Sequence, residues 1–342
     1  MDAEEIMSLF YKFSSFANVI GMGHGVKAVR GTLTGQPAIV FLVKNKLPKE
    51  RMERASLIPN KINGQLTDVI EVGDIQFLTP RNVFVRPAPP GVSIGHYRST
   101  AGTLGAIVRD LTTNELLILS NNHVLANLTD GTDTRAAIGD PILQPGPIDG
   151  GNQDKIIGHL VRFVPIHKEE GFSACRIARA FEAGLNRAIK PLRRNYCIRV
   201  MRKTKLYNTV DCALARPVSS DSVTSEIEGI GPVNGIAEPQ IGILVKKSGR
   251  STGVTTGKIL AVNVTVRVGT GARETCLFSD QVLAEAMSLP GDSGALVLSE
   301  ENLAVGLLFA GSDKATLFNR IDNVVSLLDV TFSGLNMAKQ NS

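Results

Sequence analysis

The chain has 342 residues, of which 43% are hydrophobic and 20% are charged, and its formal net charge is +5. This composition is that of an ordinary folded protein, and it excludes a disordered chain. No apolar run approaches the roughly 20 residues that a membrane-spanning helix needs, so we expect neither a membrane-embedded segment nor a membrane partner.

The first 78 residues predict a small α+β domain. Residues 2–17 place apolar side chains on one face of a helix, and strands are expected at about 19–28 and 37–43. The glycine-rich run 21–25 lacks the Gly-Lys-Ser/Thr ending of a phosphate-binding loop. We therefore assign this domain no chemistry of its own.

A proline-rich linker is predicted at residues 79–98, which contain the stiff sequence Arg-Pro-Ala-Pro-Pro-Gly. Beyond it, short apolar runs alternate with Gly, Pro and Asn turns, which favours a pair of β-barrels over an alternating βα fold. We therefore predict a mainly β region with two barrels, the first at 99–220 and the second at 221–332, and a tail at 333–342.

Two insertions interrupt the predicted first barrel. Residues 127–153 are rich in Gly, Pro and Asp, but their acids lack the spacing of a calcium-binding loop, so we expect solvated turns. Residues 169–195 include a basic helix, which opens a stretch, 176–205, with ten basic residues and one acid, Glu182. Such a stretch can bind nucleic acid or an anionic membrane. Because no nucleic-acid motif or aromatic interleaving accompanies it, we favour a solvated helix followed by an exposed strand.

Three residues of the barrel region predict a catalytic site. Ser293 lies in Gly-Asp-Ser-Gly, where small residues let the chain turn tightly and a substrate approach. His123 follows an apolar run, 115–120, that predicts a buried strand, and Asp211 precedes another short apolar run. Taken singly, these motifs also fit a polar turn, a structural histidine and a turn cap. Together they supply a nucleophile, a base and a carboxylate to orient the base, in the order of chymotrypsin and not of subtilisin.

The motifs also carry a family resemblance. The segments ILSNNHVLA and SLPGDSGALVL resemble the two signature blocks of chymotrypsin-fold serine proteases, and the Asn-Asn-His-Val form is closest to the bacterial HtrA type. VDCALARP is similar to the strand that carries the family's aspartate. KKSGRSTGVTTGKI and residues 18–74 resemble narrow-leaf-type proteins and their bacterial relatives. The resemblance implies a chymotrypsin-like double β-barrel. It also implies that Ser293 is the nucleophile, His123 the general base and acid, and Asp211 the orienting acid, with the backbone amides of Gly291 and Ser293 as the oxyanion hole.

A substrate pocket is implied by the same resemblance. Met287, six residues before Ser293, falls at its base, Phe309 and Gly311 lie on the segment that pairs with the substrate backbone, and Thr316 lies on the opposite wall. No carboxylate stands at the base to pair with a Lys or Arg side chain, and a desolvated unpaired cation is costly. We therefore predict cleavage after neutral, small-to-medium aliphatic residues.

These observations predict a serine endopeptidase that acts on proteins or peptides, with no cofactor and no metal. The alternative is a protease-fold binding or regulatory module whose site is closed or inactive. We expect the N-terminal domain, the 169–195 insertion or a protein partner to regulate the activity, and we do not expect nucleic acid as a partner. The oligomeric state stays open. Four cysteines without CxxC spacing and an acidic N-terminus lead us to expect free thiols and a cytoplasmic location.

Overall fold

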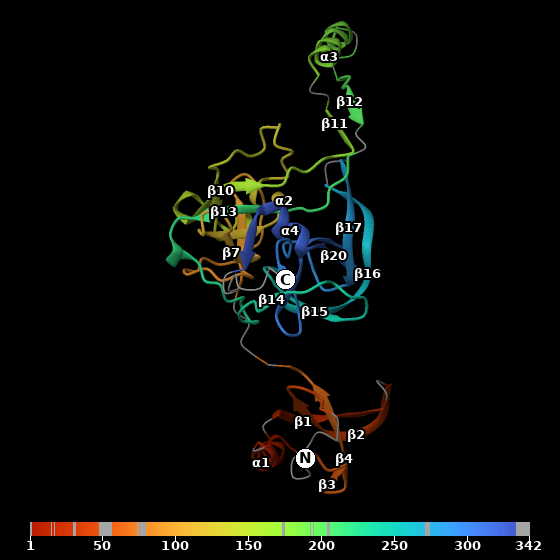
Figure 1. Cartoon of the computed structure of the whole chain (residues 1–342). Helices are drawn as coiled ribbons and strands as arrows, with labels where there is room; N and C mark the ends of the chain where they lie inside the picture. The colour runs from red at the N-terminus through yellow and green to blue at the C-terminus, as the bar shows by residue number, and fades with distance from the viewer. Residues whose placement is uncertain are drawn as a thin grey trace. The chain divides into compact units, whose positions relative to one another are not determined.

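The structure is a computed structural model. It describes residues 2–332 apart from 15, 17, 30–31, 48–56, 74, 76–79, 173–174, 192, 194, 204–205 and 271–273, and it describes only the backbone of 170–172 and 201–203. The predicted tail, 333–342, lies outside the described residues. The chain divides into two compact units, Met1–Thr79 and Pro80–Ser342. We describe each by itself (Figure 1).

The N-terminal unit is a four-stranded sheet with one helix. Helix α1 (Ala3–Phe13) begins with a capping box, in which Asp2 accepts from the amide of Glu5 at 2.9 Å and Glu5 accepts from the amide of Asp2. The sheet order is β1-β2-β4-β3, with strands β1 (Val19–Val29), β2 (Thr32–Val43), β3 (Lys61–Ile62) and β4 (Gln65–Glu71). Its core packs apolar side chains of α1 and the sheet: Leu9, Val19, Ile39, Phe41 and Val43.

The first barrel of the second unit closes through one bent segment. Strand β6 pairs with β5, and β7, which follows it in the chain, pairs with β8, so this segment joins the two ends of the sheet. The strands are β5 (Ser93–His96), β6 (Gly102–Thr103), β7 (Ala106–Asp110), β8 (Leu116–Ser120), β9 (Pro141–Leu143), β10 (Ile156–Phe163) and β13 (Ala213–Pro217). The short helix α2 (Asn122–Leu125) follows β8 directly, and short 3₁₀ helices lie at Pro147–Asp149, Gln153–Lys155 and Ser220–Ser222.

The second barrel is a ring of antiparallel pairs. Its order is β19-β18-β15-β16-β17-β20, and the pairing of β19 with β20 closes it. These strands are β15 (Leu244–Gly249), β16 (Gly253–Gly269), β17 (Thr275–Glu285), β18 (Leu296–Ser299), β19 (Leu303–Gly311) and β20 (Ala315–Arg320). Strand β14 (Gly235–Ile236) adds to β19 in parallel. Helix α4 (Ile321–Leu328) follows β20.

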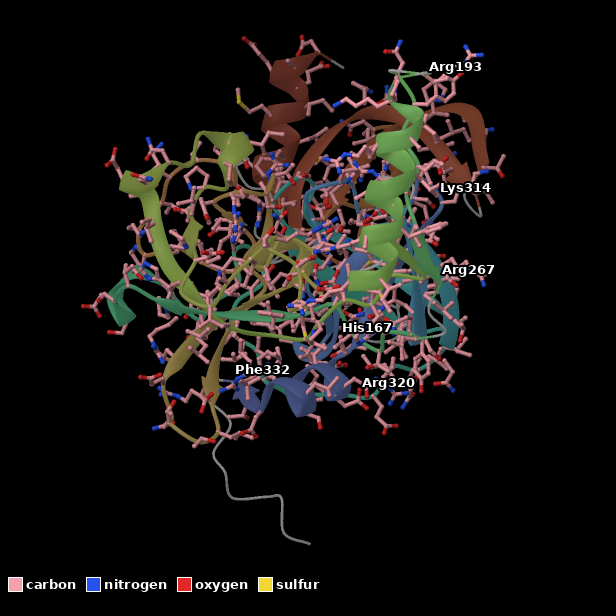
Figure 2. All side chains as sticks on the ribbon, turned by 90° about the horizontal axis from the view of Figure 1, so that it is seen from above. His167, Arg193, Arg267, Lys314, Arg320 and Phe332 are labelled. Carbon is pink, nitrogen blue, oxygen red and sulfur yellow. The ribbon has the colours of Figure 1, made fainter. Side chains whose placement is uncertain are left out.

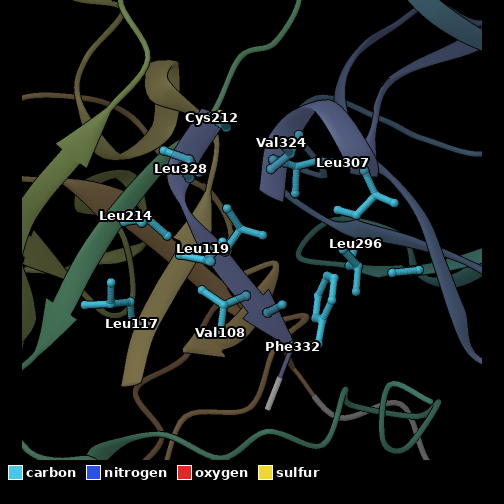
Figure 3. Packing of buried hydrophobic residues seen from close by; sticks show 14 of the residues in the cluster. Val108, Leu117, Leu119, Cys212, Leu214, Leu296, Leu307, Val324, Leu328 and Phe332 are labelled. Atoms are coloured by element: carbon cyan, nitrogen blue, oxygen red, sulfur yellow. The ribbon is translucent and has the colours of Figure 1, made fainter. Parts of the chain in front are cut away.

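A continuous apolar core joins the two barrels. Figure 3 shows Leu119 and Leu214 of the first barrel in the same cluster as Leu296 and Leu307 of the second, with Val324 of α4 beside them. Apolar burial of this kind is the main favourable term in folding, so the barrels stabilise each other. The structure confirms the predicted mainly β fold with two barrels.

Some predicted boundaries differ from the structure. Strand β5 lies inside the segment predicted as a linker, 79–98, and it pairs with β6 and β9 of the first barrel. The last described strand, β21 (Val330–Phe332), pairs with β7 and so belongs to the first barrel, not the second. The proline-rich run before β5 is not a free linker either, because the amide of Ala88 donates to the carbonyl of Ser222 at 2.9 Å and that of Gly91 to the carbonyl of Leu104 at 2.7 Å.

The insertion predicted at 169–195 lies between β10 and β13. It forms an arm made of β11 (Glu170–Phe172), helix α3 (Arg176–Ile189) and β12 (Met201–Lys203), with β11 and β12 paired antiparallel. Figure 1 shows α3 at the outer end of this arm. Within the described ranges, no helix is long and apolar enough to span a bilayer.

Candidate active site

Strand pairing in the first barrel brings His123 and Asp211 together. Strand β8 pairs with β13 so that Ser120 is opposite Ala213, and the two candidate residues lie just beyond that pair. Nδ1 of His123 is 2.5 Å from Oδ2 of Asp211, and the backbone amide of His123 donates to Oδ1 at 3.2 Å. Asp211 is 2% exposed, whereas the His123 side chain is 29% exposed. One edge of the ring is therefore held by a buried carboxylate while the ring still reaches solvent.

This pair sets the protonation behaviour of His123. Burial lowers the pKa of the imidazole, but the charge of Asp211 and its hydrogen bond raise it, and the net pKa lies above the ordinary 6.5. In the neutral ring the proton on Nδ1 is the one that Asp211 accepts, so Nε2 is left as the proton acceptor. The arrangement is that of a general base.

A buried polar chain from the second barrel holds the Asp211 segment. The side-chain oxygen of Asn319 accepts from the Asp211 amide at 3.1 Å, and its amide nitrogen donates to Gln281 at 2.6 Å. Gln281 in turn donates to the carbonyl of Thr209 at 2.8 Å. On the first-barrel side, Asn121 donates to the Asp211 carbonyl at 2.7 Å. The sequence analysis missed Asn319 and Gln281, since one polar residue inside an apolar strand gives no sign of its partner.

Ser293 follows a tight turn. The amide of Asp292 donates to the carbonyl of Leu289 at 3.0 Å, and Gly291 has a φ of +101°. Proline followed by a residue of positive φ is the sequence of a type II turn, and glycine meets that requirement without strain. Within the described part of the chain, the amides of Gly291 and Ser293 donate to no protein acceptor. They are the two amides predicted for an oxyanion hole.

The carboxylate of Asp292 fixes this turn. It accepts from the amides of Leu289, Ser251 and Thr252 at 2.8 to 3.1 Å and from the Thr252 hydroxyl at 2.6 Å. Lys247 donates to it at 3.1 Å, and both side chains are fully buried. Burial raises the pKa of Asp292, but the charge of Lys247 and these hydrogen bonds together lower it.

Lys247 is itself fully bonded. Besides Asp292, it donates to the Thr252 hydroxyl and, at 3.1 Å, to the carbonyl of Gly253. An ammonium group has three protons, and each has an acceptor here. Most of this environment comes from the sequence block 246–259, for which the sequence analysis proposed a resemblance but no role. That block surrounds the aspartate next to Ser293.

Ser293 and His123 lie on adjoining segments. The amide of Thr103 donates to the Ser293 carbonyl at 2.7 Å, and a side chain at Gly102 would collide with both Val124 and the Ser293 carbonyl. The Ser293 hydroxyl donates to the carbonyl of Phe309 at 3.4 Å. No hydrogen bond between this hydroxyl and the His123 ring is present in the described structure.

The predicted pocket residues fall into two places. Met287 belongs to the apolar core of the second barrel, and its amide donates to the Thr316 hydroxyl at 3.0 Å. That hydroxyl is 2.9 Å from the hydroxyl of Ser288, and a side chain at Gly311 would approach Ser288 to 2.7 Å. Gly311 and Thr316 therefore both lie next to Ser288, a residue that the sequence analysis did not select.

Phe309 lies in the other place, beside His123. A cavity of about 210 Å³ is lined by a mainly apolar set: His123, Leu128, Asp211, Val268, Gly269, Thr270, Cys276, Phe278 and Phe309. The Phe309 and Phe278 rings are 4.7 Å apart. Burial is the main cause that raises the pKa of Cys276, to about 11, so this thiol stays protonated at neutral pH. None of the four cysteines, all within the described residues, forms a disulfide, as predicted.

No group of three or more His, Cys, Asp and Glu side chains in the described residues is placed to hold a metal ion. In the acidic loop predicted as solvated turns, Asp130 does hold a turn, since it accepts from the amides of Thr132 and Asp133 at 2.8 and 2.9 Å, whereas two other acids bond to side chains elsewhere. Asp149 binds Arg250 of the second barrel at 2.5 and 2.6 Å, and Asp140 contacts His96 at 3.0 Å. The carboxylates of Asp149 and Asp140 therefore already bind side chains of the protein.

No family model matches the chain, and no curated protein matches it. Among solved structures it is similar to the Nocardiopsis protease NAPase, with 15% identity, 71% of this chain and 96% of that chain covered, and a TM-score of 0.45. It is similar to Thermobifida fusca Protease A, with 18% identity, 72% and 100% covered, and a TM-score of 0.45. It is also similar to the Cellulomonas bogoriensis chymotrypsin, with 15% identity, 72% and 98% covered, and a TM-score of 0.43. At such values these likenesses carry no activity or specificity over to this chain.

Proposed function

We propose that the chain is a serine endopeptidase with His123, Asp211 and Ser293 as its triad. The observation that carries this proposal is the 2.5 Å contact between His123 and buried Asp211, on a segment that adjoins Ser293. A carboxylate on Nδ1 leaves Nε2 to accept a proton, which is what an unactivated serine hydroxyl needs. The HtrA-like form of the His123 motif and the narrow-leaf-type resemblance remain predictions.

The proposed reaction proceeds in two steps. His123 takes the proton of the Ser293 hydroxyl as the oxygen attacks the peptide carbonyl, and the amides of Gly291 and Ser293 donate to the oxyanion. His123 then returns the proton to the leaving amine, which gives the acyl-enzyme. In the second step water attacks the acyl-enzyme while His123 takes its proton, and His123 then returns that proton to Ser293 as the carboxylic acid product leaves. Asp211 stabilises the imidazolium during both steps, in keeping with the raised pKa of His123.

Substrate preference is proposed to be for neutral residues. The groups beside Ser288 are uncharged: the Thr316 hydroxyl and Gly311, which has no side chain. A Lys or Arg side chain of a substrate would meet no carboxylate there and would be desolvated without a partner. The hydroxyls of Ser288 and Thr316 make this part of the pocket polar. We therefore propose that cleavage also follows small polar residues, besides the small-to-medium aliphatic residues predicted from the sequence.

The proposal is tested with a fluorophosphonate probe, which reacts with an activated serine and loses fluoride. We expect stoichiometric labelling of the full chain, none in Ser293→Ala, and strongly slowed labelling in His123→Ala. Ser220→Ala, at an exposed serine, is the matched control and should label normally. Labelling that survives Ser293→Ala would refute Ser293 as the nucleophile.

A second candidate function is a binding or regulatory module with an inactive site. It is favoured by one observation, the hydrogen bond of the Ser293 hydroxyl to Phe309 in place of His123. Folded protein that no probe labels would support it. Regulation by the N-terminal unit or the 169–195 insertion is also proposed, and comparing the labelling rates of the full chain and of a chain beginning at Pro80 tests the first version.

A further inference from the structure

The arm between β10 and β13 carries a helix that none of the catalytic proposal uses. No residue of α3 is buried. One side of the helix contacts the chain that returns from it: Asn186 exchanges two hydrogen bonds with the backbone of Ile198 at 2.7 and 2.8 Å, and Glu182 accepts from the amide of Val200 at 3.2 Å. The polar side chains on this side of α3 therefore have their hydrogen-bond partners within the arm, and the rest of the helix surface faces outward.

The outward surface of α3 contains an apolar stripe. Ile177 is 80% exposed and Phe181 is 62% exposed, and one helical turn separates them, so they lie on one face with Gly184 and Ala188. Exposed apolar side chains that stand singly are common, but a contiguous stripe on a projecting element marks a contact surface. Tyr196, just past the helix, is 69% exposed.

Positive charge borders this stripe. The stretch 176–205 holds ten basic residues and one acid and so carries +9, which leaves −4 for the rest of a chain whose total is +5. On the wheel of α3, the side next to the stripe carries four basic residues, each exposed: Arg176, Arg179, Arg187 and Lys190. Arg193 extends past the C-terminal end of the helix (Figure 2). The one acid, Glu182, is turned toward Val200.

We propose that this surface, Ile177 and Phe181 with the four basic residues of α3, binds the surface of an anionic lipid bilayer. A strongly amphipathic helix with Phe on one face and Arg and Lys beside it is the pattern of a helix that lies in the membrane interface. The apolar pair enters the headgroup boundary while the cations meet anionic headgroups. The earlier expectation of no membrane partner rested on spanning segments, and interfacial binding needs none.

Other occupants fit these observations less well. A second copy of the chain would bring one +9 stretch against another, which charge repulsion opposes. Nucleic acid would use the arginines but would leave Ile177 without a partner, since phosphate contacts are polar. Of these three occupants, an anionic bilayer is the one that contacts both the apolar stripe and the basic residues beside it.

Flotation of the full chain with vesicles tests this proposal. We expect it to float with vesicles of phosphatidylcholine containing about one-third phosphatidylserine, and not with phosphatidylcholine alone, because anionic lipid supplies the attraction. Ile177→Ser with Phe181→Ser should weaken this binding about tenfold or more. Arg179→Glu with Arg187→Glu should weaken it at least as much, and binding by the unchanged chain should fall steeply with salt.

Matched controls separate these effects from general changes. Ile148→Ser with Ile241→Ser removes two apolar residues of 67% and 65% exposure outside the arm. Lys258→Glu with Lys314→Glu makes the same charge change at exposed sites of the second barrel. Both control proteins should bind within about twofold of the unchanged chain. Because α3 buries no residue, all variants should keep their far-ultraviolet circular dichroism.

Several outcomes would overturn the proposal. One is failure to float with anionic vesicles, and another is flotation that both arm variants retain. Binding to single- or double-stranded nucleic acid that matches vesicle binding in strength and ignores the Ile177 and Phe181 change would assign the arm to nucleic acid. A dimer in light scattering that the Phe181 change dissociates would assign it to a second copy. None of these results depends on peptidase activity.

Discussion

Two buried carboxylates, Asp211 beside the first barrel and Asp292 in the second, differ in what surrounds them. In the described structure Asp211 accepts two hydrogen bonds, both from His123. Asp292 accepts five, including one from Lys247, and both members of that pair are fully buried. Asp211 is therefore placed to act on one titratable group, His123. Asp292 has all its acceptor positions filled and holds the turn before Ser293.

This difference suggests separate roles for the two pairs, catalysis for Asp211 with His123 and stability for Asp292 with Lys247. His123 reaches solvent, and the charge of Asp211 and its hydrogen bond hold the pKa of the imidazole above its ordinary value. Lys247 has no solvent contact, and its three protons are all bonded. Changes at Asp211 should therefore appear in rates, and changes at Lys247 should appear in stability.

The largest effect is expected for Asp211→Asn. The amide can keep the shape of the site, but it has one acceptor oxygen where the carboxylate uses two, for the backbone amide and Nδ1 of His123. It also has no charge to stabilise the imidazolium, so turnover should fall about 10⁴-fold. The measurement is the second-order rate of fluorophosphonate labelling, with kcat once a peptide substrate is known. The free energy of unfolding should change by only about 1 kcal/mol. A rate loss below about tenfold would contradict the proposed role of Asp211.

The next effect is the loss of stability in Lys247→Met. This change leaves the buried charge of Asp292 without its cation, which typically costs about 3–5 kcal/mol. Denaturant unfolding monitored by circular dichroism measures it. Lys258→Met, at an exposed lysine, is the control and should stay within about 0.5 kcal/mol. A loss below about 1 kcal/mol would mean that the other four donors hold Asp292 alone.

The partners of the same two carboxylates show what the sequence can and cannot predict. Its local patterns predicted His123 and Asp211, because His123 follows one apolar run, Asp211 precedes another, and both segments resemble family motifs. Lys247 could not be found this way. Lys246 and Lys247 are neighbours in one strand, so they point to opposite faces, and nothing local says which of them is buried. That choice depends on Asp292, 45 residues away in the chain.

The pocket illustrates the same limit. Counting back from Ser293 selected Met287, but the structure turns that side chain into the barrel core and leaves Ser288 beside Thr316 and Gly311. A shift of one residue reverses the face of an extended segment, so spacing alone does not decide such a position. The two barrels rest on patterns several residues long and were predictable, and the candidate triad, which stays a prediction, rests on patterns of the same kind.

A smaller loss of stability is expected for Asn319→Ala. The change removes the acceptor for the Asp211 amide and the donor to Gln281, and leaves both groups buried without a partner. Each such group costs about 1–3 kcal/mol. Asn234→Ala, at an exposed asparagine, is the control. If Asn319 positions Asp211, labelling by the probe should also slow, and a stability loss with unchanged labelling would make Asn319 purely structural.

The smallest effect is the pH dependence that Asp211 gives to His123. Because the net pKa of His123 lies above 6.5, the labelling rate should fall as pH drops below a midpoint higher than 6.5, where the ring becomes protonated and can no longer accept the serine proton. In Asp211→Asn only burial remains, which lowers the pKa, so the midpoint should move to lower pH. The stability effect has the opposite sense. A raised pKa in the folded state stabilises the protein fully below about 6.5, and this contribution is lost as pH rises through the folded value. The unfolding free energy of the unchanged chain minus that of Asp211→Asn should therefore be larger at acidic than at alkaline pH, and a difference that grows with pH would show that Asp211 does not hold the proton of His123.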